Sequence, residues 1–211
     1  MKLDDVNIYV ILDIPLLDKF GVNVVDAMKS AYLGGAKMFQ LRYKGVPDGE
    51  IYRIGKELIP IAKNLGAIFL INDSLSVALA LGADGVHLGE RDLPIFEARK
   101  IAGGKFIIGA SASSVESAMR AEKQGASYIG YGAVFETTTK KDPCPGSLDD
   151  LRQVMEIARI PVFPLGGINE DNVGKIAEIG CRKVCIASGI ITKPDIRAAT
   201  EKILKILTEE K

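Results

Sequence analysis

Short runs of β-branched and aromatic residues alternate along this chain with longer segments in which apolar residues recur every three or four positions. The second pattern is typical of amphipathic helices, and several of these segments end in the glycine that often follows a helix. A strand followed by a helix, repeated, predicts parallel strands joined by crossover helices. The apolar runs that we interpret as strands number eight and span residues 7–13, 37–43, 67–73, 85–89, 106–111, 128–135, 161–167 and 183–190.

Eight such units in 211 residues predict an α/β fold, namely a (β/α)8 or TIM barrel that forms a single domain over residues 1–211. A doubly wound open sheet is the alternative. That fold usually has fewer strands, and no GxGxxG motif follows the first run. The chain contains no linker and no low-complexity segment that would mark a domain boundary.

The composition narrows the choice of partners and compartment. Lysine and arginine total 27, as do aspartate and glutamate, so no net charge draws the chain to nucleic acid or to anionic membranes. No apolar run approaches the roughly 20 residues that span a bilayer, and the start "MKLDDVNIYVIL" is unlike a secretory signal. The three cysteines, an odd number, favour reduced thiols and a cytoplasmic location. Association into a homo-oligomer stays open.

Candidate chemistry lies where the runs end, because barrels of this kind carry their active sites at the carboxyl ends of the strands. Side chains alternate in a strand, so Gln40, Arg42 and Lys44 in "QLRYK" should share one face at the barrel mouth. Buried cations need anionic partners. Internal carboxylates would serve, but we favour a substrate diphosphate because of the residues that follow.

Carboxylates follow the third and fourth runs. Asn72 and Asp73 end "IND", and Asp92 lies in "GERD" just beyond the fourth run. Neighbouring strands would bring the two aspartates together, and two carboxylates with open positions suit Mg²⁺, which also takes water and phosphate oxygens. Asp84 precedes the fourth run and belongs to the opposite end of the barrel. His87 lies inside a strand, where we expect it to pack in the interior or to support a neighbouring site residue rather than to catalyse.

The remaining strand ends offer groups that could bind anions. The stretch "YGAVFETTTKKDPCPG" places threonines and lysines after the sixth run, where they could bind phosphate or form an ordinary solvated loop; local sequence alone favours the loop. The fifth run ends in Ser111. The loops after strands seven and eight often grip phosphate in this fold, and here they contain Gly166, Gly167, Ala187 and Ser188.

Taken together, "QLRYK", "IND", "GADGVHLGERD", "GAS", "VFETTTKKD", "LGGI" and "IASGI" resemble the thiamine-phosphate synthase family over nearly the whole chain. The resemblance implies a transferase of thiamine biosynthesis that joins 4-amino-2-methyl-5-hydroxymethylpyrimidine diphosphate to a thiazole phosphate with Mg²⁺. It also implies the residue roles: Asp73 and Asp92 would bind the metal, and Ser111 and Lys140 would be catalytic. The pyrimidine diphosphate would contact Gln40, Arg42, Lys44, Asn72, Ser111 and Lys140, and the thiazole phosphate would contact Thr137, Thr139, Gly167, Ala187 and Ser188.

Two positions depart from the family pattern. Ser74 stands where the family usually has arginine, which suggests that one diphosphate contact is missing. Ser113 stands where it usually has histidine. Related thiazole tautomerases share this barrel, and some depend on that histidine for proton transfer, so its absence argues against a tautomerase. A barrel that binds a phosphate ligand without catalysis is the other alternative.

Overall fold

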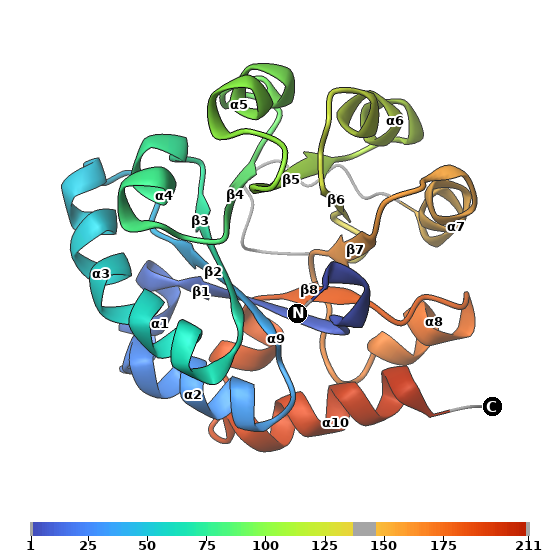
Figure 1. The fold of residues 1–211 in the computed structure, drawn as a ribbon. Coiled ribbons are helices and arrows are strands. Elements are labelled where there is room, and N and C mark those ends of the chain that lie inside the picture. Colours follow the sequence, from blue (N-terminus) through green and yellow to red (C-terminus); the bar gives the residue numbers. More distant parts are fainter. Residues whose placement is uncertain (1, 137–146, 210–211) are drawn as a thin grey trace.

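In the computed structural model, which describes residues 2–136 and 147–209, parallel strands form one closed barrel in the order of the sequence. Each strand pairs with its neighbours in the chain, and β1 pairs with β8 to complete the ring (Figure 1). The (β/α)8 fold predicted from the sequence is therefore confirmed. The strands are β1 Ile8–Asp13, β2 Met38–Arg42, β3 Ile68–Asn72, β4 Gly85–Leu88, β5 Ile107–Ala112, β6 Tyr128–Gly132, β7 Val162–Leu165 and β8 Val184–Ile186.

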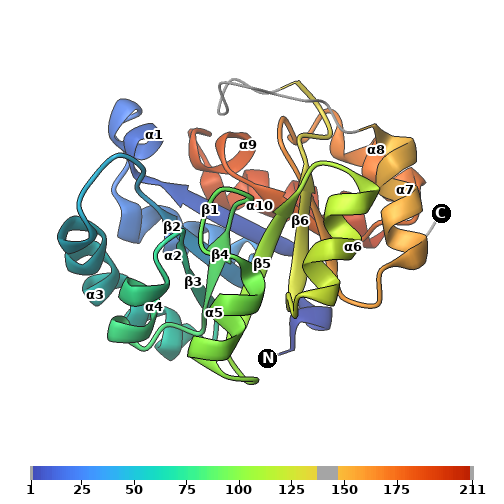
Figure 2. The ribbon, with the colours of Figure 1, turned by 90° about the horizontal axis from the view of Figure 1, so that it is seen from above.

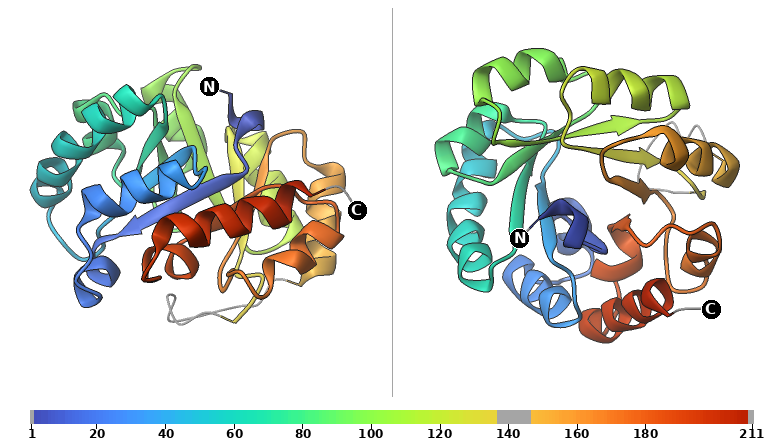
Figure 3. Two further views of the ribbon diagram at one scale, coloured as in Figure 1. Left: turned by 90° about the horizontal axis from the view of Figure 1, so that it is seen from below. Right: turned by 45° about the vertical axis from the view of Figure 1, so that its right-hand side comes forward.

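Helices surround the barrel and bury one apolar face against it (Figure 3). Most begin at a side-chain cap, as Ser114 and Ser147 show by accepting from the backbone N–H three residues further on. The described helices are the 3₁₀ helix η1 Leu3–Asp5 and the α-helices α1 Ile14–Lys19, α2 Val24–Leu33, α3 Asp48–Leu65, α4 Leu75–Leu81, α5 Ile95–Ala102, α6 Val115–Lys123, α7 Leu148–Ile157, α8 Val173–Glu178, α9 Ser188–Ile191 and α10 Ile196–Thr208.

Strand alternation divides the buried residues into two cores. In β2, Phe39 and Leu41 point outward and join the large core beneath the helices, whereas Met38 points into the barrel. Met38 packs there with Tyr9, Tyr128 and other residues of the inner cluster. By the same alternation, Gln40 and Arg42 also point into the barrel, and each lies nearer than Met38 to the carboxyl end of β2.

The two ends of the barrel differ. At the amino end, η1 covers the strands, and the ammonium of Lys183 donates to the carbonyls of Leu3, Asp4 and Val6. The short helices α1 and α9 lie at the opposite end (Figure 2). The amino end is therefore closed by backbone and one lysine, which leaves the carboxyl end for the site.

Three predicted strands extend well beyond the observed ones. The seventh ends at Leu165 rather than at residue 167. The sixth ends at Gly132 rather than at residue 135, and the eighth ends at Ile186, beyond which α9 begins. Ile190 and Ile191 are fully buried, so their apolar character suited either a strand or a helix. Gly189 lets α9 pack closely against the loop after β7, since a Cβ on this residue would lie 2.2 Å from the carbonyl oxygen of Ile168.

Candidate active site

An ion pair joins the first two strands at the mouth of the barrel. Asp13 and Arg42 are opposite each other in the β1–β2 register, and the Arg42 guanidinium donates to Oδ2 of Asp13. The other carboxylate oxygen, Oδ1, accepts from the backbone N–H of Leu16 at 3.1 Å and so caps α1. Arg42 therefore has the internal carboxylate partner that was the alternative to a substrate anion.

A second charge cluster follows β2, β3 and β4. The ammonium of Lys44 lies 3.0 Å from Oδ2 of Asp73, and the side chains are 53% and 31% exposed. Burial, together with hydrogen bonding to the Asp73 carboxyl, raises the pKa of Asp92. The structure thus brings Lys44, Asp73 and Asp92 together, as expected for neighbouring strand ends.

The backbone holds both carboxylates in fixed positions. Asp73 has φ of 63°, a conformation that residues other than glycine rarely adopt, and its N–H donates to the His87 carbonyl at 2.8 Å. Oδ2 of Asp92 accepts from the N–H of Gly89 at 2.6 Å. Strained backbone of this kind clusters at ligand sites.

This donor set fits a small divalent cation. Mg²⁺ is commonly held by one or two carboxylates together with water and phosphate oxygens. Besides burial, the neighbouring Asp73 carboxyl raises the pKa of Asp92, and a cation bound between the two carboxylates would oppose that effect. Within residues 2–136 and 147–209, no cluster contains three or more histidine, cysteine, aspartate or glutamate side chains able to hold a metal, so a metal here would rely on two protein ligands.

A small cavity of about 80 Å³ lies beside Arg42, between β7 and β8. Its wall includes Gly167, Ala187 and Ser188, which the sequence assigned to a phosphate. Gly167 has φ of 66°, and a Cβ there would lie 2.3 Å from the carbonyl oxygen of Glu136. Only glycine lets the backbone pass this close, so the part of the wall at Gly167 is main chain.

Other predicted residues lie deeper in the barrel. Gln40 is 1% exposed, and its amide donates to the Tyr9 hydroxyl. Ser111 is half-buried, and its Oγ lies 3.0 Å from Nε2 of His87. Asn72 is buried at the end of β3. The sole histidine is thus tied to a predicted substrate residue rather than merely packed.

Ser74 does not point freely into the site. Its hydroxyl accepts from the N–H of Val77 and so caps α4, and it donates to Oδ2 of Asp48 at 3.0 Å. Ser76 also donates to Asp48, at 3.1 Å. Ser74 and Asp48 line a cavity of about 740 Å³ that extends from Lys44 and Asp73. A carboxylate therefore lies beside the position at which the family usually has arginine.

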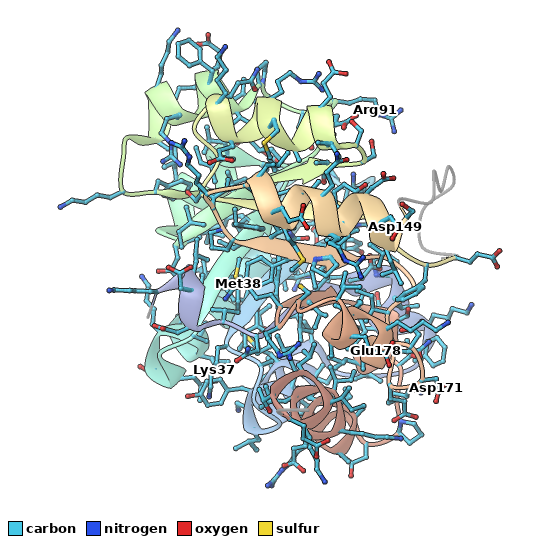
Figure 4. All side chains as sticks on the ribbon, turned by 90° about the vertical axis from the view of Figure 1, so that its right-hand side faces the viewer. Lys37, Met38, Arg91, Asp149, Asp171 and Glu178 are labelled. Atoms are coloured by element: carbon cyan, nitrogen blue, oxygen red, sulfur yellow. The ribbon has the colours of Figure 1, made fainter. Side chains whose placement is uncertain are left out.

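The other position that departs from the family pattern, Ser113, is at the surface. Ser113 is exposed, with its hydroxyl 3.4 Å from a carboxylate oxygen of Glu90. Arg91 lies on the outer surface (Figure 4). Thr137, Thr139 and Lys140, together with Cys144, lie outside the described residues.

Sequence reasoning missed Asp13, Tyr9 and Tyr128. Asp13 is the last residue of β1, so the rule applied to the other strand ends could have found it. Tyr9 and Tyr128 lie in strand interiors and carry no such signal.

Cys181 and Cys185 are buried and form no disulfide with a described residue. None of the described helices is long and apolar enough to cross a bilayer.

Comparisons with known proteins agree with this geometry. The family described as thiamine monophosphate synthase matches residues 8–190. The thiamine-phosphate synthase of Fusobacterium nucleatum is 40% identical over 205 residues, which cover 97% of this chain and 98% of that protein. The enzyme of the same name from Pyrococcus furiosus is 43% identical over 88% of this chain and 89% of its own.

A solved structure is similar over the same length. Thiamine phosphate pyrophosphorylase from Pyrococcus furiosus superposes with a TM-score of 0.86 at 40% identity, covering 95% of this chain and 94% of that one. Both the sequence and the arrangement of the barrel are therefore shared with these proteins. This chain belongs to the thiamine monophosphate synthase family.

Proposed function

We propose that the carboxyl-terminal mouth of the barrel is where this chain joins the pyrimidine diphosphate to the thiazole phosphate. The observation that carries the proposal is a cluster of Lys44, Asp73 and Asp92 at the ends of β2, β3 and β4, with Arg42 of β2 beside a second cavity that includes Gly166 and Gly167. Two anion sites next to each other suit two phosphorylated substrates. The thiazole phosphate would lie against Gly167, Ala187 and Ser188, and the family resemblance assigns Thr137 and Thr139 to the same phosphate.

The charges at the mouth support a requirement for a divalent cation. Arg42 and Lys44 face three carboxylates, those of Asp13, Asp73 and Asp92. When all three are ionised, these side chains carry one excess negative charge, which would repel a diphosphate. We infer that Asp73 and Asp92 hold Mg²⁺, which would stabilise negative charge on the leaving diphosphate. Lys140 would add a further positive charge.

The described side chains account for the remaining steps. Arg42 and Lys44 are each paired with a carboxylate, so they would orient the diphosphate through their remaining N–H donors, while the cation would offset the excess negative charge as the C–O bond breaks. The aminopyrimidine ring spreads the positive charge left on the methylene carbon, and the thiazole nitrogen then attacks that carbon. No strong base is required, and Gln40, Asn72 and Ser111 serve to hold the ring in line with the nucleophile.

A turnover assay tests this proposal. The purified chain is mixed with both substrates and Mg²⁺, and the expected products are thiamine phosphate and diphosphate. Isomerisation of the thiazole carboxylate without condensation would instead indicate a tautomerase, and ligand binding without either product would indicate a non-catalytic barrel. The cytoplasmic location inferred from the cysteines is part of the same proposal.

A further inference from the structure

A chain of polar groups crosses the interior of the barrel and connects two of the proposed substrate residues. Ser111 Oγ lies 3.0 Å from His87 Nε2, and His87 Nδ1 lies 2.8 Å from the Tyr128 hydroxyl. The Tyr128 hydroxyl donates to the Tyr9 hydroxyl at 3.0 Å, and Tyr9 also accepts from the amide of Gln40. Five residues from five strands thus form one hydrogen-bonded path between the two sides of the mouth.

Glycines make the space for this path. A Cβ on Gly109 would lie 2.1 Å from the Tyr128 ring, and one on Gly130 would lie 3.0 Å from Cε1 of His87. Tyr9 and Tyr128 are almost fully buried and pack edge to face, with ring centroids 5.8 Å apart. Packing on every side therefore fixes where the hydroxyl groups and the imidazole ring can lie.

The direction of the first hydrogen bond comes from its geometry, in which the Tyr128 hydroxyl is the donor and the Tyr9 hydroxyl the acceptor. Tyr128 has one hydroxyl proton and donates it to Tyr9, so towards His87 it can only accept. His87 Nδ1 must then carry a proton. In the neutral imidazole, which has only one N–H, Nε2 is then an acceptor, and at 3.0 Å it could take the hydroxyl proton of Ser111.

Burial keeps the two phenols of this path uncharged. Desolvation raises the pKa of both Tyr9 and Tyr128 well above the usual value for tyrosine. The phenols therefore stay protonated at neutral pH and act only as hydrogen-bonding groups. Their effect on the site is to orient the next group in the chain.

We propose that His87 is a positioning residue, held by Tyr128 and Tyr9 as the neutral Nδ1–H tautomer, which makes Ser111 present oxygen lone pairs rather than a proton to the substrate. With its proton used inward, Ser111 accepts an N–H group of the ligand. It is unsuited to a phosphate oxygen, which needs a donor. This inference rests on the proposed site and deepens it, because Ser111 then faces the amino-bearing ring rather than the diphosphate.

Nitrogen NMR tests the tautomer directly, because the chain contains a single histidine. In ¹⁵N-labelled protein at neutral pH, long-range ¹H–¹⁵N spectra distinguish a protonated from an unprotonated ring nitrogen. We expect a protonated Nδ1 and an unprotonated Nε2. A protonated Nε2, whether in the other tautomer or in the imidazolium ion, would overturn the proposal, since Ser111 would then accept from the ring. This measurement needs no substitution and no turnover.

Kinetics test the consequence for the substrate. Tyr128→Phe removes the acceptor for Nδ1–H without touching Ser111. We expect mixed tautomers and a fall of about 3- to 10-fold in kcat/KM for the pyrimidine diphosphate, the effect of one neutral hydrogen bond. The KM for the thiazole phosphate should not change. The matched control is Tyr32→Phe, which removes a hydroxyl bonded to the Leu65 carbonyl outside the barrel and should leave the kinetics unchanged.

The outcomes are distinguishable from failure of the proposed function. A folded Tyr128→Phe protein with unchanged tautomer and kinetics would overturn the positioning role. If that variant does not fold, the spectrum of the unmodified protein still decides the proposal. Absence of thiamine phosphate from the unmodified protein would contradict the proposed function, while the nitrogen spectrum would remain a valid test of the tautomer.

Discussion

Replacing Ser74 with arginine, the residue usual in the family, should have little effect on its own. Oδ2 of Asp48 accepts from the hydroxyls of both Ser74 and Ser76. An arginine at position 74 would have this carboxylate within reach and would pair with it. We therefore expect Ser74→Arg to change the KM for the pyrimidine diphosphate by less than about 3-fold, and the double variant Ser74→Arg with Asp48→Asn to lower it.

The expected magnitudes follow from the contacts. A charge-assisted hydrogen bond to the diphosphate contributes about 1.5–3 kcal/mol, so the double variant should lower this KM by at least about 10-fold. Ser74 also caps α4 by accepting from the N–H of Val77 at 3.3 Å. Loss of such a cap costs about 1 kcal/mol, which lowers the Tm by about 2–4 °C in a domain of this size.

Steady-state kinetics with each substrate varied separately, together with thermal unfolding, would measure both effects. Ser76→Arg adds the same charge beside Asp48 without removing the cap, so it serves as the control for stability. If Ser74→Arg alone tightens the pyrimidine diphosphate as much as the double variant does, Asp48 does not compete for the guanidinium. If neither protein differs from the parent in KM or kcat, no cation is needed at this position and the reasoning is wrong.

Three further predictions concern separate parts of the molecule. Asp73→Ala and Asp92→Ala should each reduce kcat in Mg²⁺ by at least about 100-fold, because metal stabilisation of a leaving group contributes several kcal/mol. The control is Asp149→Ala, in the exposed first turn of α7, and near-normal turnover of either site variant would contradict the metal assignment. Ser188→Asp should raise the KM for the thiazole phosphate and spare that of the pyrimidine diphosphate, since a carboxylate repels phosphate; an unchanged thiazole KM would mean that the second anion site is elsewhere. Lys183→Met should lower stability by about 1–3 kcal/mol, measured by urea unfolding, because the half-buried hydrogen bonds to the carbonyls of Leu3 and Val6 and the exposed one to that of Asp4 are lost. The value of kcat should not change, and a loss of turnover in the folded protein would link the two ends of the barrel.

The sequence by itself determined the architecture and the location of the chemistry. Alternating strand and helix patterns predicted the closed barrel because both periodicities follow from local geometry. The rule that polar groups gather at strand ends identified Arg42, Lys44, Asp73 and Asp92, and the structure brings the last three together and pairs Arg42 with Asp13. Strand limits were less certain, since buried apolar residues such as Ile190 suit a strand or a helix equally well.

The tertiary structure decided which groups face one another. Asp13 meets Arg42 only because β1 and β2 pair in one particular register, and Asp48 reaches Ser74 only because α3 packs beside α4. The path from Ser111 through His87 to Tyr128 and Tyr9 joins residues up to 119 positions apart in the chain. No local pattern encodes such a contact, because hydrogen-bond direction depends on the three-dimensional arrangement of every donor and acceptor in the closed barrel.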